Sequence, residues 1–326
     1  MISSAPEAQM TGSPRQHRAA ETAGRTTGLA SAGERDLILA RSGAATVEYR
    51  MRGGRPHGSG TVVVFHGGHM RAQLALGEDV FTEAGFRVLV PSRPGYGRTP
   101  LVPGSADVTV ADFTDAVARL CRDCGLDQVA AVVGISAGAR TALTMAARHP
   151  GLVRRVILLS PVGFLPWPDR RTRLGGRIVF HPGIEALTWA LVRTTIHFAP
   201  GSALRLLTRD LSLLPVGQVL ARLTPADRTT LTGLYASMRS GRGFAADLLP
   251  LADCTARVVQ PTLIVATRND RAVPFAHARS LAAAITRSEL VESRADSHLI
   301  WFGSDYPAIA AKIRAVLLTD PQRASE

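Results

Sequence analysis

The stretch VAAVVGISAGARTALTMAARHP, residues 129–150, places Ser136 between two glycines, after an apolar run and directly before an alanine-rich helical pattern. A short run rich in Val and Ile predicts a buried strand, and the alanine-rich pattern after it predicts a helix. Gly134 and Gly138 lack the Cβ atoms that would collide with neighbouring backbone in a tight turn. The stretch therefore predicts a strand, a sharp turn and a helix, with the serine at the turn.

Similar apolar runs recur on both sides of this unit. They lie around residues 36–50, 60–68, 86–97, 127–136, 154–163, 261–270 and 288–293, and helical patterns separate most of them. Short continuous apolar strands that alternate with helices are typical of a parallel sheet covered on both faces. We therefore predict an α/β protein with a doubly wound, mostly parallel sheet. Thr109 and Asp112 fit a capping box at the start of one of the helices.

The alternation stops after Gly163 and resumes at about residue 256. Between these points the chain shows helical periodicity with Pro and Gly breaks and no clear strand run. A stretch of this length without structure of its own is improbable in a compact domain. We predict a tail at 1–32, an α/β core formed by 33–163 and 256–320, and an inserted helical segment at 164–255.

Composition restricts the classes of protein that the chain can represent. Apolar residues make up 46% of it, which is enough for a buried core, whereas the polar first thirty residues predict a disordered tail without a signal peptide. No apolar run reaches the length of a membrane span, so we expect no stable membrane insertion and a cytoplasmic location. The net charge of +12 comes from scattered arginines without basic clusters between aromatics. This pattern argues against nucleic-acid binding and favours attraction to anionic surfaces.

The three cysteines cannot all pair with one another, which suits a reducing compartment. Cys121 and Cys124 form a CxxC motif, but no second Cys or Cys/His pair follows at zinc spacing. The motif falls late in a helical pattern, away from the strand-to-helix entry of thioredoxin-like motifs. We interpret these residues as partly buried thiols and expect no metal.

Ser136 has the strongest functional signal in the chain. A serine on a strained turn at the end of a parallel strand projects its hydroxyl at the carboxyl edge of the sheet, where ligands bind in open α/β sheets. The motif GISAG is short, but its strand–turn–helix context makes it specific. We predict that Ser136 is a nucleophile.

At this point the sequence resembles the α/β-hydrolase superfamily from about residue 36 to residue 318. The matching pieces, in order, are VVVFHGGHM, PSRPGYGRTP, GISAGAR, PTLIVATRNDRAVP and ADSHLIWF. The resemblance implies a catalytic triad of Ser136, Asp270 and His298. Asp296 is the rival acid, but it lies only two residues from His298 and suits a loop surface. The other acid position that the family uses has no carboxylate here, because the chain reads SPVGF.

The resemblance also implies an oxyanion hole, the pair of N–H groups that stabilises a tetrahedral oxyanion. One donor would be Ala137 and the other Gly68, with His69 as the alternative. His66 is expected to be structural. Arg93 stands where relatives often carry Asp, a departure that leaves the triad unchanged.

The insertion at 164–255 matches the position of the family's helical cap. Its large apolar residues are expected to form cap core for the most part, and some to line a substrate pocket. They are Trp167, Phe180, Trp189, Phe198, Leu206, Leu207, Leu213 and Leu214.

The expected function is a serine hydrolase that cleaves a small lipophilic ester or related carbonyl compound through an acyl-enzyme. It would need no cofactor and no metal, and its partner would be a small-molecule substrate. Carbon–carbon bond hydrolases, lactonases, perhydrolases and acyltransferases share the triad and stay open as alternatives. A ligand-binding member of the fold without activity is a further alternative, and the sequence leaves the oligomeric state open.

Overall fold

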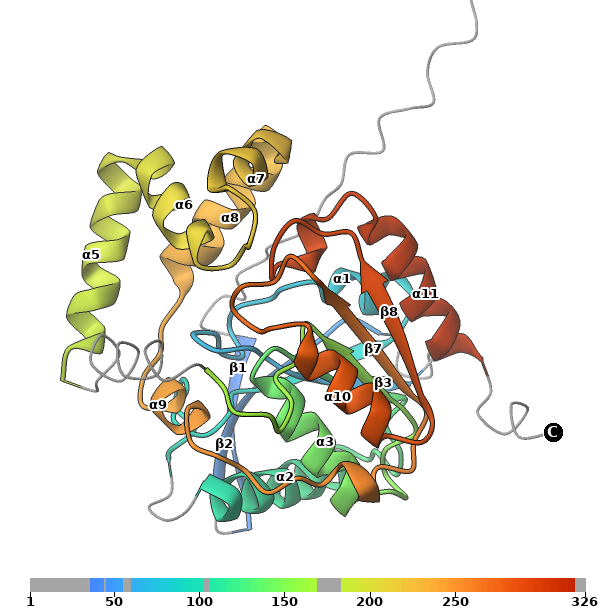
Figure 1. Ribbon diagram of the computed structural model, residues 1–326. Coiled ribbons are helices and arrows are strands. Elements are labelled where there is room, and N and C mark those ends of the chain that lie inside the picture. The colour runs from blue at the N-terminus through green and yellow to red at the C-terminus, as the bar shows by residue number, and fades with distance from the viewer. Residues whose placement is uncertain (1–35, 44, 55–59, 102–105, 169–182, 320–326) are drawn as a thin grey trace, which may run out of the picture.

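The computed structural model describes residues 36–43, 45–54, 60–101, 106–168 and 183–319 (Figure 1). The tail predicted at 1–32 lies outside the described residues.

Eight strands form one sheet in the order β1-β2-β4-β3-β5-β6-β7-β8. Strands β1 and β2 pair antiparallel, as do β2 and β4, whereas the other neighbours pair parallel. The structure therefore confirms the mostly parallel α/β sheet. The strands are β1 (Leu37–Ser42), β2 (Ala45–Arg52), β3 (Thr61–Phe65), β4 (Arg87–Pro91), β5 (Ala131–Ile135), β6 (Val156–Leu159), β7 (Thr262–Thr267) and β8 (Ser288–Ser293).

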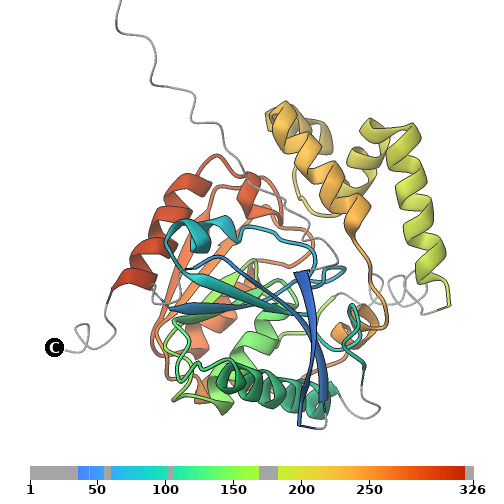
Figure 2. The same ribbon diagram turned by 180° about the vertical axis from the view of Figure 1, so that it is seen from behind.

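Helices cover both faces of the sheet (Figures 1 and 2). On one face lie α2 (Ala106–Asp123), α3 (Gly138–Arg148) and α10 (Ala276–Ala284), and on the other lie α1 (Asp79–Glu83) and α11 (Tyr306–Leu318). Because side chains of a strand alternate between faces, Val132 packs in one core cluster and its neighbours Ala131 and Val133 in the other. Burial on both faces explains the continuous apolar runs in the sequence.

The predicted capping box at Thr109 is wrong. Helix α2 already begins at Ala106, so Thr109 lies within its first turns and is buried. Alanine has the highest helix propensity, and an aspartate near the N-terminus is favoured by the helix dipole, so residues 106–107 extend the helix upstream.

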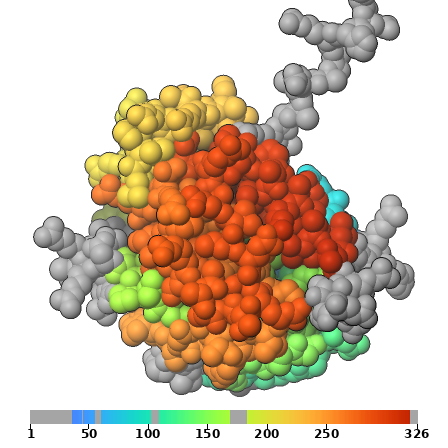
Figure 3. Space-filling view, turned by 45° about the vertical axis from the view of Figure 1, so that its right-hand side comes forward, coloured from blue at the N-terminus to red at the C-terminus, as the bar shows by residue number. Residues whose placement is uncertain are grey.

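A lobe of helices follows β6 and stands beside the core (Figure 3). Its helices are α5 (Glu185–Phe198), α6 (Pro200–Arg209), α7 (Val216–Arg222) and α8 (Pro225–Ser237), and α9 (Gly243–Asp247) follows them and lies against the core (Figure 1). All five helices fall within the predicted insertion, and together we call them the cap. Helices α5 and α6 pack against each other and against α8. The short helix η2 (Thr255–Arg257) then leads the chain back into β7.

In the part of the chain that the structure describes, no helix has both the length and the apolar character needed to cross a membrane.

Candidate active site

Ser136 stands on a sharp turn between β5 and α3, and its φ is 50°. The two glycines are required by close backbone contacts. A Cβ on Gly138 would lie 2.2 Å from the Phe65 carbonyl oxygen, and one on Gly134 would lie 2.5 Å from the Ala139 Cα. A left-handed φ at a non-glycine residue costs free energy that the surrounding structure must offset, and such strain clusters at functional sites. The turn leaves Ser136 partly exposed to solvent.

Asp270 and His298 meet at the same edge of the sheet. The Oδ2 atom of Asp270 lies 2.6 Å from Nδ1 of His298, and its Oδ1 atom accepts a hydrogen bond of 2.8 Å from the Val273 N–H. Both side chains are buried. A carboxylate held in this way fixes the tautomer with the proton on Nδ1, which leaves the Nε2 atom of His298 as an acceptor.

The end of β6 connects this pair to the turn at Ser136. The Ser136 N–H donates to the Leu159 carbonyl at 3.0 Å, and the next residue, Ser160, donates from Oγ to the His298 carbonyl at 2.8 Å. Among the described residues the Ser136 hydroxyl has no hydrogen bond to His298. Catalytic hydrogen bonds are often long without substrate and tighten in the complex.

Asp296, the rival acid, has a different partner. Its Oδ1 atom lies 2.5 Å from a guanidinium nitrogen of Arg222 on α7, and its carbonyl accepts a hydrogen bond from Ser212. Asp296 therefore joins the histidine loop to the cap, whereas Asp270 contacts the imidazole.

The loop that follows β3 lies against the turn. A Cβ on Gly67 would lie 3.4 Å from the Ser136 Cβ. Burial and then the charge of Asp247 raise the pKa of the Tyr96 hydroxyl, and a backbone hydrogen bond from His69 opposes this rise. The backbone of His69 is thus engaged. In contrast, no described carbonyl accepts a hydrogen bond from the N–H of Gly68 or Ala137, which suits both groups to an oxyanion hole.

His69 is held mainly by the cap. Its φ is 60°, and its carbonyl accepts a 2.9 Å hydrogen bond from the Arg239 N–H. Its Nδ1 lies 2.7 Å from the Ser240 Oγ, which also accepts a 2.8 Å hydrogen bond from the Trp189 indole N–H. The Phe244 ring centroid is 4.0 Å from that of His69. Burial lowers the pKa of His69 to about 4, so the imidazole is neutral at pH 7.

His66 supports the loop from below. Its Nδ1 lies 2.9 Å from the Gly67 carbonyl, and its Nε2 accepts a 3.0 Å hydrogen bond from the Arg93 N–H. Burial, and then the charge of Arg93, lower its pKa to about 3. Both ring nitrogens contact backbone, as a structural histidine requires.

A buried ion pair joins the cap to the core. Arg93 binds both carboxylate oxygens of Asp247 on α9, at 2.5 and 2.8 Å, and the Tyr96 hydroxyl donates to the same carboxylate at 2.6 Å. Burial alone would raise the pKa of Asp247, but Arg93 and Tyr96 hold it below its ordinary value. Sequence reasoning missed this network. Its one signal was the unusual arginine at position 93.

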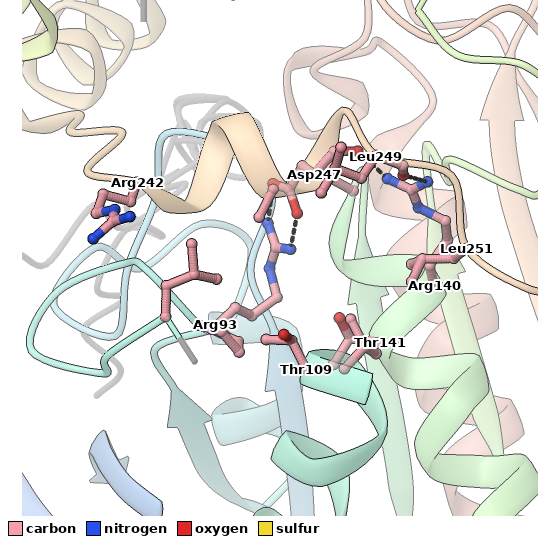
Figure 4. A pocket seen from close by; sticks show the side chains of 13 residues that line it. Arg93, Thr109, Arg140, Thr141, Arg242, Asp247, Leu249 and Leu251 are labelled. Carbon is pink, nitrogen blue, oxygen red and sulfur yellow. Dashed lines mark hydrogen bonds and ion pairs between the residues drawn. The ribbon is translucent and has the colours of Figure 1, made fainter. Parts of the chain in front are cut away.

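A cavity of about 250 Å³ borders Ala137, the residue after Ser136 (Figure 4). Its apolar lining includes Leu101, Val110, Leu249 and Leu251, and its charged lining residues are Arg93, Arg140, Arg242 and Asp247. The Arg93 guanidinium is paired with Asp247, and Arg140 donates to the backbone carbonyls of Asp247 and Leu249. The cavity therefore combines apolar walls with charged groups, and the guanidinium groups of Arg93 and Arg140 are already engaged.

The CxxC thiols lie apart from this site. Burial raises the pKa of Cys121 to about 12, so this thiol is protonated and unreactive at neutral pH. All three cysteines are reduced. The described residues contain no group of three or more His, Cys, Asp or Glu side chains that could hold a metal ion.

The fold and the geometry at Ser136 define an α/β hydrolase. The chain belongs to the alpha/beta hydrolase fold family, whose model matches residues 60–304. It is 29% identical over 280 residues to the uncharacterized hydrolase YcgS of Bacillus subtilis, which covers 84% of this chain and 94% of that protein. It is 28% identical over 231 residues to a 2-hydroxy-6-oxononadienedioate/2-hydroxy-6-oxononatrienedioate hydrolase of Pseudomonas sp, with 67% and 74% covered.

Among solved structures, an alpha/beta hydrolase fold protein from Nakamurella multipartita superposes with a TM-score of 0.70. That match is 24% identical in sequence and covers 86% of this chain and 98% of the other. These likenesses establish the fold and the general activity: the protein is a hydrolase.

Proposed function

We propose that this protein is a serine hydrolase that cleaves a small lipophilic ester, or a related carbonyl compound, through an acyl-enzyme. Ser136 is the nucleophile, His298 the general base and acid, and Asp270 the residue that orients His298. The observation that carries the proposal is the 2.6 Å contact between Asp270 Oδ2 and His298 Nδ1, made at the sheet edge that also holds Ser136.

The first half of the reaction acylates the enzyme. His298 Nε2 takes the proton of the Ser136 hydroxyl while Oγ attacks the ester carbonyl. The tetrahedral intermediate then collapses, the bond from carbonyl carbon to alkoxy oxygen breaks, and His298 returns the proton to the leaving alcohol. Asp270 stays ionised and stabilises the imidazolium during both transfers.

The second half releases the acid. Water loses a proton to His298 as it attacks the acyl carbon, and Ser136 leaves with that proton. In both halves the negative oxygen is stabilised by the N–H groups of Ala137 and Gly68. Two such donors contribute several kcal/mol to the transition state when they are aimed before the reaction begins.

A small substrate is supported by the cavity of about 250 Å³ beside Ala137, whose lining includes that proposed oxyanion donor but neither Ser136 nor His298. The leucine and valine side chains in its lining favour an apolar acyl or alkyl group.

Labelling with a fluorophosphonate probe tests the nucleophile without knowledge of the substrate. The intact protein is expected to be labelled at Ser136, and Ser136→Ala to lose labelling and the hydrolysis of p-nitrophenyl esters. Ser288→Ala is the matched control, since Ser288 lies on β8 and its hydroxyl bonds to the Ala282 carbonyl. Equal labelling of Ser136→Ala and the intact protein would disprove the mechanism. A protein without labelling would be a ligand-binding member of the fold.

A second candidate is the hydrolysis of a carbon–carbon bond beside a ketone. It is favoured by the similarity to the Pseudomonas hydrolase named for 2-hydroxy-6-oxononadienedioate. The discriminating measurement compares kcat/KM for a 2-hydroxy-6-oxo dienoic acid with that for p-nitrophenyl butyrate. A ratio above one would favour the second candidate, and Ser136→Ala should abolish both activities.

A further inference from the structure

The outer side of helix α5 is apolar and exposed. Leu187, Leu191 and Phe198 are 71%, 65% and 79% exposed, and Ile184 before the helix is 44% exposed. Their spacing of three, four and seven residues places them on one side of an α-helix. Thr194, which is also exposed, is the uncharged residue that completes this side. The sequence predicted that most large apolar residues of the cap would be core, but Phe198, Leu206 and Leu213 are exposed, and Phe180 lies outside the described residues.

The opposite side of α5 holds the contacts to the protein. Trp189 is buried and bonds to Ser240, and Ile196 packs against the core. The carboxylate of Glu185 accepts hydrogen bonds from the backbone N–H groups of Ser240 and Gly241. The helix is therefore anchored through its inner side, and these anchoring contacts do not involve the leucines and the phenylalanine on its outer side.

The acidic residues of the cap are mostly buried, whereas its arginines are mostly exposed. Residues 183–249 contain four acidic residues. Glu185, Asp227 and Asp247 are buried, and Asp210 is exposed. Arginines supply nearly all of the exposed charge. On α6, Arg205 and Arg209 are exposed near Leu206, which is 55% exposed, and Arg209 forms a surface ion pair of 3.5 Å with Asp210. Apolar side chains and exposed arginines thus occur together on adjacent helices.

Helices α5 and α6 both pack on α8, and α5 forms the side of the cap that lies farthest from the sheet (Figure 1). We call the set Leu187, Leu191, Phe198, Arg205, Leu206 and Arg209 the outer cap surface. We propose that the outer cap surface docks on an anionic phospholipid bilayer, with α5 lying in the plane of the interface.

The apolar side chains and the arginines of the outer cap surface each match one layer of an anionic bilayer. Leucine and phenylalanine on one side of an amphipathic helix insert at the boundary between head groups and acyl chains, and nearby arginines bind anionic head groups. A second copy of this chain fits less well, because each copy would present the same arginine-bearing surface, and Asp210 is the only exposed carboxylate between residues 183 and 249 to oppose those arginines. The proposal does not depend on the proposed activity. Its residues lie on the side of α5 opposite Trp189, the residue through which α5 contacts the loop beside Ser136.

Sedimentation with large vesicles tests the proposal on the full-length protein. Vesicles of phosphatidylcholine with phosphatidylglycerol are compared with pure phosphatidylcholine vesicles at 0.15 M salt. We expect strong partitioning onto the anionic vesicles, and at least a tenfold loss for the triple variant Leu187→Ser, Leu191→Ser, Phe198→Ser, which keeps every charge. Arg205→Gln with Arg209→Gln should lose roughly thirtyfold, at about 1 kcal/mol for each arginine near the surface.

The matched control is Ile38→Ser with Leu39→Ser on β1, because these two side chains are 45% and 50% exposed but lie outside the cap. It should bind like the unchanged protein. Hydrogen exchange of the unchanged protein gives a second measurement that needs no variant: anionic vesicles should protect the amides of 184–198 and leave those of β1 unchanged.

Three results would overturn the proposal. The triple variant could partition like the unchanged protein, which would mean that net charge alone drives binding. The vesicles could leave exchange in α5 unaltered. The protein could form a dimer that the triple variant dissociates, which would assign the surface to a second copy. Labelling of Ser136 is scored separately, so failure of one proposal is distinguishable from failure of the other.

Discussion

The Nδ1 atom of His69 lies 2.7 Å from the Oγ atom of Ser240, a residue of the segment that links α8 to α9. His69 directly follows Gly68, whose N–H is a proposed oxyanion donor. Trp189 on α5 donates to the same Ser240 hydroxyl. Ser240 is therefore one of the contacts, with the Arg239 N–H and the Phe244 ring, that couple the position of the cap to the position of this donor.

Ser240→Ala is expected to lower kcat about tenfold and to change KM less than twofold. Loss of the hydroxyl loosens the loop, and a displaced Gly68 N–H weakens the transition state more than the bound substrate. Steady-state kinetics on one p-nitrophenyl ester provides the test. Thr195→Ala on α5, which removes a hydroxyl bonded to Leu191, should leave kcat unchanged. A rise in KM alone would show that Ser240 shapes the pocket and does not position the loop.

Asp270→Asn should reduce kcat by about three to four orders of magnitude, because an amide cannot hold the imidazole in the tautomer that accepts a proton from serine. Asp296→Asn should change kcat less than threefold, since Asp296 contacts Arg222. The same ester assay compares both variants with the unchanged protein. If the two effects were reversed, Asp296 would be the acid of the triad.

The elements that could be predicted are those whose signal is local. The strand before Ser136 is predicted by its apolar sequence, and all five of its residues are buried in the structure. Gly134 and Gly138 occupy positions where a Cβ would meet backbone. The pairing of Asp270 with His298 came from a resemblance and could not be derived from spacing, because 28 residues and a strand separate the two.

Contacts between the cap and the core could not be predicted. Arg93 and Asp247 are 154 residues apart, and no local sequence pattern at either residue predicts its partner. The exposure of Phe198 could not be predicted either. A helix rich in leucine and phenylalanine has the same sequence pattern whether another element covers its outer side or solvent contacts it. Such features depend on how separate units dock, which helical periodicity does not encode.

Asp247→Asn should destabilise the protein by about 3–5 kcal/mol, because it leaves the buried Arg93 guanidinium without its counter-charge. Urea unfolding followed by circular dichroism measures this difference. Arg222→Gln removes one member of a pair whose arginine side chain is 63% exposed, and it should cost at most about 1 kcal/mol. Equal effects of the two substitutions would show that the Arg93–Asp247 pair contributes no more than a surface contact.

Stability should fall as the pH is lowered from about 6.5 toward 4. Burial lowers the pKa of His66 to about 3 and those of His69 and His277 to about 4, so these imidazoles stay neutral in the folded protein while the unfolded chain takes up protons below its ordinary pKa of about 6.5. The stabilisation is fully present above pH 6.5 and is lost below it, by about 1.4 kcal/mol per pH unit for each histidine.

His277→Gln tests this pH dependence. Nδ1 of His277 accepts a hydrogen bond from the Gly163 N–H, and the glutamine oxygen can accept it instead without titrating. Urea unfolding at several pH values should show a shallower loss of stability for the variant between pH 6.5 and 4. An unchanged slope would mean that His277 takes up a proton without unfolding.

Chain-length specificity depends on the cavity beside Ala137. Each methylene that a substrate buries contributes about 0.8 kcal/mol, or roughly fourfold in kcat/KM, until the cavity is filled. We expect kcat/KM for p-nitrophenyl esters to rise from acetate to a medium chain and to fall for long chains. Leu249→Phe, which adds volume to the cavity wall, should move the optimum to a shorter chain by reducing the space available. Leu206→Phe adds the same volume to an exposed position on α6 and should leave the optimum in place. An optimum that stays fixed in Leu249→Phe, or activity confined to acetate, would show that the acyl chain binds outside this cavity.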